Sequence, residues 1–346
     1  ATVGFVPPDL MPLQEPMPTA DAFTPLTLHW LVSEPFAGSG GHTTIFRMVR
    51  HLVEFGHICH VHVIPVNFMH GYTPQQIRRY VDEHFMVTGA IFHLWDGTIG
   101  PADATIATYW KTVPLLQKLP MPGRGYYLVQ DFEPYFYPVG SEYIQAESTY
   151  RSGLHCLTIG PWLAKLLAEQ YGAQADYFDF AVDTEVYEPL QVPRPAHPRI
   201  AFYARPSTPR RAYELGVEAL RLVKQSNPGI ELVFYGAQNL PSPPFVVTDA
   251  GLVNPWELAK LFSSCDVGLV FSTTNPSLVP LEMMACRCAV VDLASERVAG
   301  LLEDGVNCRL AEPTPQAIAD TLLDLVWDRE GRKRIVETAY QQVKHM

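Results

Sequence analysis

The sequence lacks the CxxC pairs that mark a structural zinc site. Its 346 residues include six cysteines, all in or beside apolar runs. They stand at positions 59, 156, 265, 286, 288 and 308. Unpaired cysteines in apolar surroundings are typical of free thiols in a reducing compartment. We therefore expect buried thiols, no structural zinc and a cytoplasmic protein.

The sequence also has fewer basic than acidic residues. Lysine and arginine number 25 against 36 aspartates and glutamates, which gives a formal net charge of −11. A general nucleic-acid binder needs a surplus of positive charge to displace counterions, so the balance argues against nucleic acid as a partner. An anionic ligand would have to be held by a local basic cluster.

Long apolar runs are missing as well. The sequence contains no stretch of about 18 uncharged apolar residues, and its start is not a basic segment followed by an apolar one. Neither a transmembrane segment nor a signal peptide is therefore predicted. Peripheral association with the inner face of the cell membrane stays open.

The sequence does hold enough apolar material for a large core. Hydrophobic residues make up 47% and charged residues 18%, which excludes a mostly disordered chain. The length points to two domains that share a cleft. Proline, with 31 residues, is abundant between the hydrophobic runs, which indicates many sharply ended loops.

The first half of the chain is predicted to form an arm, residues 1–24, and a first lobe, residues 25–190. The arm is rich in proline and methionine without periodicity. Apolar runs in the lobe predict strands at 26–32, 58–64, 90–94, 126–130 and 155–159. Apolar residues at helical spacing predict a helix over 42–55. Strands separated by helices are typical of parallel βαβ units.

A proline-rich stretch, 188–198, is the best candidate for a linker. The second lobe, residues 191–327, repeats the alternation. Its predicted strands are 200–204, 231–235, 266–271 and 289–292, and its predicted helices are 210–225, 255–264 and 280–287. An amphipathic segment, 314–344, closes the chain, and we expect a helix in 328–346 to pack back toward the first lobe. The predicted fold class is α/β, with two Rossmann-like lobes that face each other across a cleft.

A glycine-rich loop, Gly-Ser-Gly-Gly-His at 38–42, follows the first predicted strand and opens the first helix. Gly40 and Gly41 would let the backbone approach a ligand, and the free amides of a helix N-terminus favour an anion. An ordinary tight β-to-α turn is the other interpretation. The dinucleotide fingerprint is not met, because Thr43 stands where it needs a third glycine.

A cluster of arginines lies at the start of the second lobe. Arg205 ends a predicted strand, and Arg210 and Arg211 begin the next helix. Guanidinium groups that converge from a strand end and a helix start suit the bidentate recognition of a diphosphate. A solvated pair of charges beside a helix is the alternative, but cations at a helix N-terminus oppose the helix dipole and favour a bound anion.

The most informative segment is Thr-Thr-Asn-Pro-Ser-Leu-Val-Pro-Leu-Glu at 273–282. A strand runs into a small polar loop that contains Asn275, and Pro280 suits the first turn of the following helix. Backbone amides at Ser277 and Leu278 could then bind phosphate oxygens. Glu282, one turn into the helix, could accept hydrogen bonds from a ribose or sugar diol, although a glutamate there also suits the helix dipole.

These residues resemble the donor-binding lobe of retaining GT-B glycosyltransferases of the GT4-like group. The family pattern has an arginine at a strand end, a basic residue about five positions on, an acid, and a glutamate after seven intervening residues. Arg205, Arg210 and Glu282 fit this pattern. Position 274 does not, because Thr274 stands where the family has an acid that contacts the transferred sugar.

Within that group the sequence is similar to the WsaF-like bacterial rhamnosyltransferases. The resemblance covers nearly the whole chain after about residue 25 and is carried by the segments 107–110, 127–134 and 274–286. It implies a dTDP-L-rhamnose donor and a glycan or lipid-linked glycan acceptor in bacterial surface polysaccharide synthesis. It also implies retention of configuration and no metal cofactor. Peripheral association with a polysaccharide assembly complex would fit this role.

Carboxylates at the ends of first-lobe strands are candidates for the acceptor side. Asp131, with Glu133 two residues on, follows the strand at 126–130, and Asp96 follows the strand at 90–94. The carboxyl ends of strands in open α/β sheets are where ligands bind, so Asp131 could orient the acceptor hydroxyl or take its proton. Capping of the next segment is an equal alternative for Asp96 and Asp131. A metal held by Asp131 and Glu133 is a minority interpretation.

Two histidines, His60 and His62, alternate along one predicted strand. Histidines in such positions are more often packed or solvated than metal-bound, and no cysteine, aspartate or glutamate of suitable spacing joins them, so no metal site is predicted.

Catalysis is thus assigned to Asp131, Arg205, Arg210 and Glu282. Two other functions stay open. One is a sugar-nucleotide epimerase of GT-B fold, and the other is a degenerate module that binds a glycan or nucleotide without catalysis, which the threonine at position 274 keeps plausible.

Overall fold

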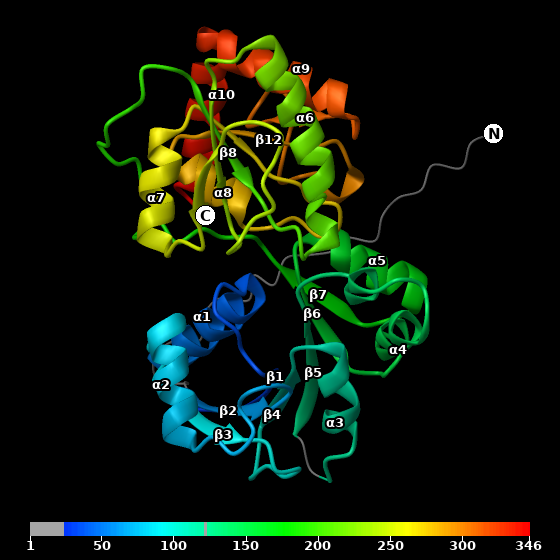
Figure 1. Cartoon of the computed structure of the whole chain (residues 1–346). Coiled ribbons are helices and arrows are strands. Elements are labelled where there is room, and N and C mark those ends of the chain that lie inside the picture. The colour runs from blue at the N-terminus through cyan, green and yellow to red at the C-terminus, as the bar shows by residue number, and fades with distance from the viewer. Residues whose placement is uncertain (1–23, 121–122) are drawn as a thin grey trace, which may run out of the picture.

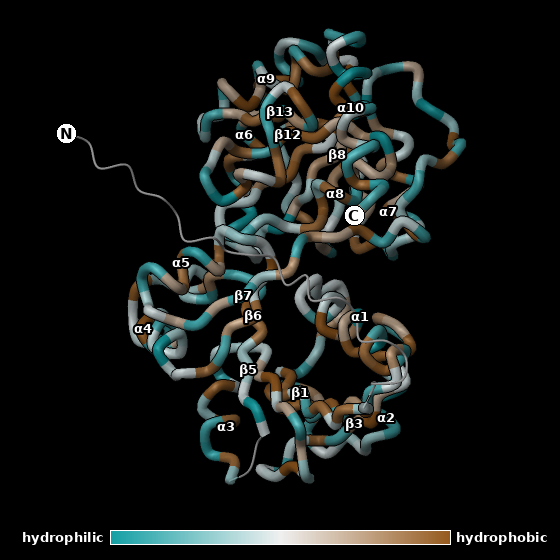
Figure 2. Tube along the Cα trace, turned by 180° about the vertical axis from the view of Figure 1, so that it is seen from behind, coloured by the Kyte–Doolittle hydropathy of each residue, from teal (hydrophilic) through white to brown (hydrophobic). Residues whose placement is uncertain are grey.

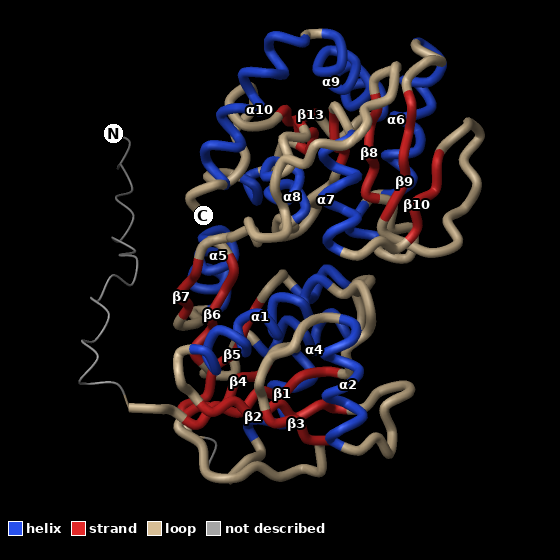
Figure 3. Tube along the Cα trace, turned by 90° about the vertical axis from the view of Figure 1, so that its left-hand side faces the viewer, coloured by secondary structure: helices blue, strands red, loops and turns tan. Residues whose placement is uncertain are grey.

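The computed structural model describes residues 24–120 and 123–346, and it places them in two lobes (Figure 1). All but the last residue of the predicted arm, 1–24, lies outside the described residues. Each lobe contains one sheet of parallel strands with helices beside it, and Figure 3 shows the strands of the two sheets as separate layers. The predicted fold class, α/β with two Rossmann-like lobes, is confirmed.

The first lobe is built on seven parallel strands in the order β3-β2-β1-β4-β5-β6-β7. They are β1 Thr27–Ser33, β2 Ile58–Ile64, β3 Ile91–Leu94, β4 Ala104–Ala107, β5 Arg124–Val129, β6 His155–Ile159 and β7 Ala175–Phe178. The helices are α1 Gly40–Glu54, α2 Pro74–His84, α3 Val113–Gln117, α4 Ser141–Thr149 and α5 Pro161–Tyr171. Apolar residues of α1 and α2 pack on one face of the sheet, and those of α3 and α5 pack on the other.

The second lobe is built on six parallel strands in the order β10-β9-β8-β11-β12-β13. They are β8 Arg199–Tyr203, β9 Glu231–Tyr235, β10 Thr248–Gly251, β11 Val267–Leu269, β12 Ala289–Leu293 and β13 Arg309–Ala311. The helices are α6 Tyr213–Ser226, α7 Pro255–Ser264, α8 Val279–Ala285, α9 Pro315–Trp327 and α10 Arg329–Val343. Helices α6 and α9 cover one face of this sheet, and α7, α8 and α10 cover the other.

Short elements account for most differences from the sequence-based expectation. Strands β4, β7, β10 and β13 have three or four residues each and were not predicted, because so short a run shows no clear alternation. The helix expected from 210 begins at Tyr213, after a short 3-10 turn over Pro209–Arg211. Figure 2 shows the hydrophobic segments gathered along the strands inside each lobe.

The C-terminal segment folds differently from the prediction. The amphipathic run 314–344 is divided at Asp328, whose side chain caps α10 by accepting a hydrogen bond from the Gly331 amide at 2.9 Å. Helix α10 packs on α8, α9 and β12 of its own lobe. Its main contacts are therefore not with the first lobe, toward which residues 328–346 were expected to pack.

The chain that connects the lobes begins to pack on the second lobe before the predicted linker, 188–198, is reached. Phe180, Val182 and Tyr187 belong to the core that contains α7 and α8. Within the predicted linker 188–198, the Leu190 amide donates to Ser263 Oγ at 3.1 Å. The prolines thus end regular structure, while the segment itself is held on α7.

All six cysteines are buried and free, as expected. Among the described residues, no helix combines the length and the apolar character that a membrane crossing requires.

Gly216 is predicted to be required for the contact between α6 and its sheet. The Cβ of an alanine at this position would overlap the ring of buried Phe202. Alanine favours a helix by about 1 kcal/mol over glycine, but overpacking a core costs about 1–3 kcal/mol, so Gly216→Ala should lower the free energy of unfolding by roughly 1 kcal/mol. Chemical denaturation measures this change.

Gly229→Ala is the matched control. Its added Cβ would lie 3.7 Å from His197 Nδ1, an ordinary contact. The free energy of unfolding should change by less than about 0.5 kcal/mol. Equal stability of the two variants would show that α6 can shift away from Phe202.

Candidate active site

The lobes meet where β5 of the first sheet and β11 of the second sheet end. Asp131 lies two residues after β5, and the loop with Thr274 and Asn275 follows β11. Ligands of open parallel sheets bind at the carboxyl ends of strands, so the chain brings the two ligand-binding edges together. Five hydrogen bonds and one ion pair described below join the lobes at this junction.

Asp131 is the centre of the junction. Its side chain belongs to the first lobe, is 12% exposed, and accepts two hydrogen bonds from the second lobe. Oδ2 accepts from the Thr274 hydroxyl at 2.9 Å, and Oδ1 accepts from the Asn275 amide at 3.0 Å. The amide of Phe132 also donates to Oδ1, at 2.9 Å. These three donors hold the carboxylate in a fixed orientation at the junction.

Arg210 pairs with the same carboxylate. Its Nε lies 3.3 Å from Asp131 Oδ2, yet this buried nitrogen makes no hydrogen bond. The guanidinium carbon stands 4.2 Å from the centre of the Phe136 ring of the first lobe, a cation–π contact. Burial lowers the pKa of Arg210, the charge of Asp131 opposes this, and Arg211 and Arg205 lower it further. Arg210 is thus a crowded cation with one anionic neighbour.

The other two arginines differ in what they contact. Arg205 Nη1 donates across the junction to the Gly38 carbonyl at 3.4 Å and within its own lobe to the Tyr203 hydroxyl at 3.3 Å. Arg211 Nη1 donates to the Phe271 carbonyl at 3.0 Å, which orients it along its own lobe. The structure therefore brings Arg205 and Arg210 to the junction and gives Arg211 a structural bond.

The glycine loop lies opposite these arginines. Helix α1 begins at Gly40, and Ser39 caps it by accepting from the His42 amide at 3.4 Å. A side chain at exposed Gly40 would meet no atom within 4 Å, so the space in front of the helix start is open. Gln130, which the sequence did not single out, donates to the Gly41 carbonyl at 3.2 Å and ties the loop to the end of β5.

Asn275 was predicted as a donor-binding residue, but its side chain joins the lobes. It is 2% exposed, and Nδ2 donates to the Gln130 and Ile159 carbonyls, each at 3.0 Å. Gln130 directly follows β5, and Ile159 is the last residue of β6, both in the first lobe. The amide therefore satisfies two strand ends, and only its orphaned Oδ1 is without a partner.

Glu282 lies near charged groups of the first lobe and of the connection between the lobes. Burial raises its pKa to about 7, while the charge of Arg47 and the Tyr187 hydroxyl oppose the rise. Arg47 comes from α1 of the first lobe and pairs with Asp183 at 3.8 Å. Arg47 was missed because nothing in its own helix distinguishes it from a surface arginine. Glu282 is thus a titratable carboxyl near neutral pH.

The start of α8 is arranged as the sequence indicated. Pro280 occupies the first turn, and Leu278 directly precedes the helix. The Ser277 hydroxyl accepts a hydrogen bond from the Val279 amide at 3.1 Å. Both Ser277 and Leu278 are half-buried and lie in the loop that carries Thr274.

The Glu133 side chain is held inside the first lobe. Its carboxylate accepts a hydrogen bond from the Trp110 amide at 2.7 Å inside the first lobe. Burial raises the pKa of Glu133 to about 8, with Asp131 adding to the rise, so the group is largely protonated at neutral pH. Within residues 24–120 and 123–346, no three histidine, cysteine or acidic side chains are placed to hold a metal ion.

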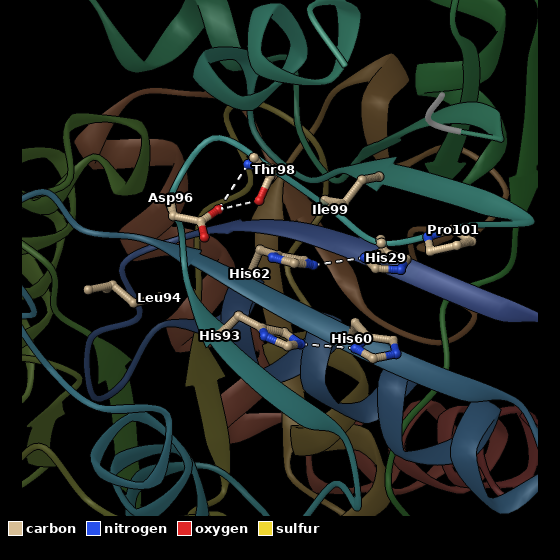
Figure 4. Close-up of a pocket in the computed structure, with 10 residues that line it drawn as sticks. His29, His60, His62, His93, Leu94, Asp96, Thr98, Ile99 and Pro101 are labelled. Carbon is tan, nitrogen blue, oxygen red and sulfur yellow. Dashed lines mark hydrogen bonds between the residues drawn. The ribbon is translucent and has the colours of Figure 1, made fainter. Parts of the chain in front are cut away.

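Asp96 faces a different part of the first lobe. Its Oδ1 accepts from the Thr98 amide at 2.9 Å and from the Thr98 hydroxyl at 2.8 Å, an Asx-type cap. Its side chain lines a cavity of about 310 Å³ on the sheet (Figure 4). Of the two candidate carboxylates, only Asp131 reaches the junction.

Four histidines line the same cavity and form a stacked group, which we call the histidine tetrad (Figure 4). It consists of His29, His60, His62 and His93. The parallel register places His29 beside His60 and His62 beside His93. His29 Nδ1 lies 2.8 Å from His62 Nε2, and His60 Nδ1 lies 2.9 Å from His93 Nε2. The two histidines predicted as packed or solvated are therefore paired with two that the sequence did not connect to them.

Comparison with known proteins agrees with this architecture. A sucrose-phosphate synthase from Thermosynechococcus elongatus matches with a TM-score of 0.69 at 13% identity over 92% of this chain and 94% of that one. Anabaena HepE in complex with UDP-glucose matches with a TM-score of 0.67 at 14% identity over 92% and 95%. A glycosyltransferase from Rickettsia africae matches with a TM-score of 0.66 at 12% identity over 93% and 94%. The two lobes and their junction thus define the GT-B fold of glycosyltransferases.

Two family models identify the group more closely. Residues 97–160 match the N-terminal domain of WsaF, and residues 198–323 match its C-terminal domain, so that the two matches together span more than half of the chain. The chain belongs to the WsaF-like family of GT-B glycosyltransferases.

A curated relative is the O-antigen biosynthesis protein RfbC of Myxococcus xanthus, 35% identical over 246 residues. The match covers 70% of this chain but 19% of the relative, so the chain spans about a fifth of that protein's length.

The histidine tetrad predicts a stability loss in acid. Burial and the neighbouring imidazoles lower the pKa of His29 to about 4 and that of His62 to about 3. The unfolded chain binds protons at these positions below its pKa of about 6.5, whereas the folded chain does not. The contribution to stability is therefore complete above pH 6.5 and is lost as the pH falls toward 3.

The double variant His29→Phe/His62→Phe replaces both members of one pair and keeps two aromatic rings in place. It should lose less stability than the wild type as the pH falls. Denaturation curves between pH 7 and 4 measure this loss, with exposed His51→Gln as the control that should follow the wild type. Parallel pH dependence of the double variant and the wild type would contradict the assignment.

Proposed function

We propose that the chain is a glycosyltransferase that moves a sugar from a nucleotide sugar onto a glycan acceptor in surface polysaccharide synthesis. The observation that carries the proposal is the convergence of Arg205 and Arg210 of the second lobe on the glycine loop and Asp131 of the first lobe. Family membership and the name of the O-antigen biosynthesis relative support it.

The second lobe is the donor side in this proposal. Arg205 and Arg210 neutralise the diphosphate while it becomes the leaving group, and the amides of Ser277 and Leu278 add hydrogen bonds. Preorganised cations at the site of developing charge lower the barrier directly. Glu282 holds the nucleoside sugar. Gly40, beside which the space is open, and Gly41, which lies against the Gln130 side chain, let the donor approach the backbone.

The first lobe is the acceptor side. An acceptor hydroxyl oxygen forms the new bond to the anomeric carbon while the bond from that carbon to the diphosphate oxygen breaks, and the leaving diphosphate keeps the electron pair. The hydroxyl proton passes to Asp131 or to the departing phosphate. Transfer with retention needs no enzyme nucleophile when attack comes from the donor's own face. The proposal includes no metal, in line with the family resemblance.

The donor is proposed to be dTDP-L-rhamnose, and the acceptor a glycan or lipid-linked glycan. This specificity rests on the resemblance to the WsaF-like rhamnosyltransferases. HepE was crystallised with UDP-glucose, so a UDP-sugar is the competing donor. We place the chain in the cytoplasm, with peripheral association with a polysaccharide assembly complex.

A module that binds nucleotide without catalysis is a second candidate. Thr274, which stands where the family resemblance implies an acid, favours it. A sugar-nucleotide epimerase is distinguished by incubation with donor alone, since it would produce an isomer without any acceptor. A non-catalytic module would bind the nucleotide and release no free nucleoside diphosphate.

Removal of one donor arginine should abolish most turnover. Arg205→Ala is expected to lower the release of nucleoside diphosphate by about 100-fold, a typical loss when one charge-stabilising group is removed. Arg221→Ala is the control, because Arg221 lies on α6 and pairs with Glu218 on the surface, and it should retain wild-type turnover.

A thermal-shift panel with dTDP, UDP and GDP tests donor identity in the same preparations. At equal concentration, a ligand that binds the native state more tightly raises the melting temperature further, so dTDP should stabilise the chain most. Preference for UDP or GDP would refute the rhamnosyl donor and leave glycosyl transfer intact. Wild-type turnover by Arg205→Ala would refute the site.

A further inference from the structure

Arg210, which the proposed function assigns to the donor's diphosphate, is paired with Asp131 in this structure. The Asp131 and Arg210 side chains are 12% and 28% exposed, and Nε of Arg210 makes no hydrogen bond although it is buried. The guanidinium is packed on Phe136, and two further arginines raise the positive charge around it. Arg210 therefore has an anion nearby but lacks the bidentate geometry that a guanidinium forms with a carboxylate or phosphate.

Asp131 is held independently of Arg210. Thr274 Oγ1 and the amides of Phe132 and Asn275 donate to its two oxygens at 2.9–3.0 Å. Loss of the arginine would leave the carboxylate with these three donors, whereas loss of Asp131 would leave Arg210 with no ionic partner among its described contacts. The pair is thus asymmetric, and Arg210 is the member free to change partner.

We propose that the Asp131 carboxylate competes with the donor's diphosphate for Arg210, so that donor binding transfers this arginine from one lobe's carboxylate to the phosphate. The proposal rests on the proposed function and adds the sequence in which Arg210 changes its partner. Before the donor binds, Arg210 neutralises Asp131. Once the donor is bound, Thr274 and Asn275 still hold the carboxylate in place, and it is no longer paired with a cation.

The arrangement also accounts for Thr274. A carboxylate at this position would lie about a hydrogen-bond length from Asp131, and two like charges so close cannot both be ionised at little cost. A hydroxyl instead donates to Asp131. Thr274 and Asn275 are therefore positioning residues for a carboxylate that the opposite lobe supplies.

Asp131→Asn tests the competition. The asparagine keeps an oxygen for the two amides but has no charge, so Arg210 is available to phosphate. We expect it to bind the preferred nucleoside diphosphate of the panel above about tenfold more tightly than the wild type, a typical coupling between two ligands of one group. Isothermal titration calorimetry measures both dissociation constants. The matching nucleoside without phosphate, followed by ligand-observed NMR, should bind both proteins equally.

A double-mutant cycle with Arg210→Gln shows whether the effect acts through that arginine. In the Arg210→Gln background, Asp131→Asn should leave nucleoside diphosphate affinity unchanged. Thr274→Val should have the opposite effect on affinity. Asp131 then loses one hydrogen-bond donor and pairs more strongly with Arg210. Diphosphate binding should therefore weaken several-fold. Thr274→Ser, which keeps the hydroxyl, should restore wild-type affinity.

The outcomes distinguish failure of the competition from failure of the proposed function. If the wild type binds dTDP, UDP or GDP but Asp131→Asn binds it equally or more weakly, the competition is refuted and the proposed function stands. Weaker binding of the nucleoside as well would show that Asp131 only closes the lobes. If the wild type binds none of the three nucleotides, the proposed function itself fails.

Discussion

The structure depends on one buried carboxylate. Asp131 belongs to the first lobe, but two of its three hydrogen-bond donors and its cationic partner belong to the second lobe. A buried carboxylate without partners costs several kcal/mol, so this group holds the lobes in the arrangement that satisfies it. The loop with Thr274 and Asn275, the arginine cluster and the end of β5 are thereby brought to one place.

Charges of the two lobes also influence each other away from Asp131. Glu282 of the second lobe lies near Arg47 of the first, which opposes the rise in its pKa. Arg205 likewise donates to the Gly38 carbonyl of the opposite lobe. Asp131, Arg205 and Arg210 therefore make contacts across the junction, and Glu282 is influenced by a charge from the opposite lobe. A lobe in isolation would lack these partners.

Local patterns were sufficient to predict the two α/β lobes, most long strands, the glycine loop and the arginines, because these features depend on periodicity and on neighbours in the chain. The junction was beyond such reasoning. Thr274 and Asp131 are 143 residues apart. A threonine in place of an acid indicated the loss of a sugar contact, not a hydrogen bond to the other lobe. Asn275 looked like a ligand-binding amide, yet it satisfies strand ends of the other lobe. The histidine tetrad needed the register of three strands, since only pairing places His29 and His93 beside the alternating His60 and His62.

The central claim is that the junction is a diphosphate site whose arginine is occupied by Asp131 until the donor arrives. A crystal structure of the chain with a bound nucleoside diphosphate is the most direct measurement. The account predicts the diphosphate between Arg205 and Arg210, beside the start of α1, with Asp131 still bound to Thr274 and Asn275 but no longer paired with Arg210. A nucleotide bound elsewhere, or one bound there while Arg210 stays on Asp131, would contradict it.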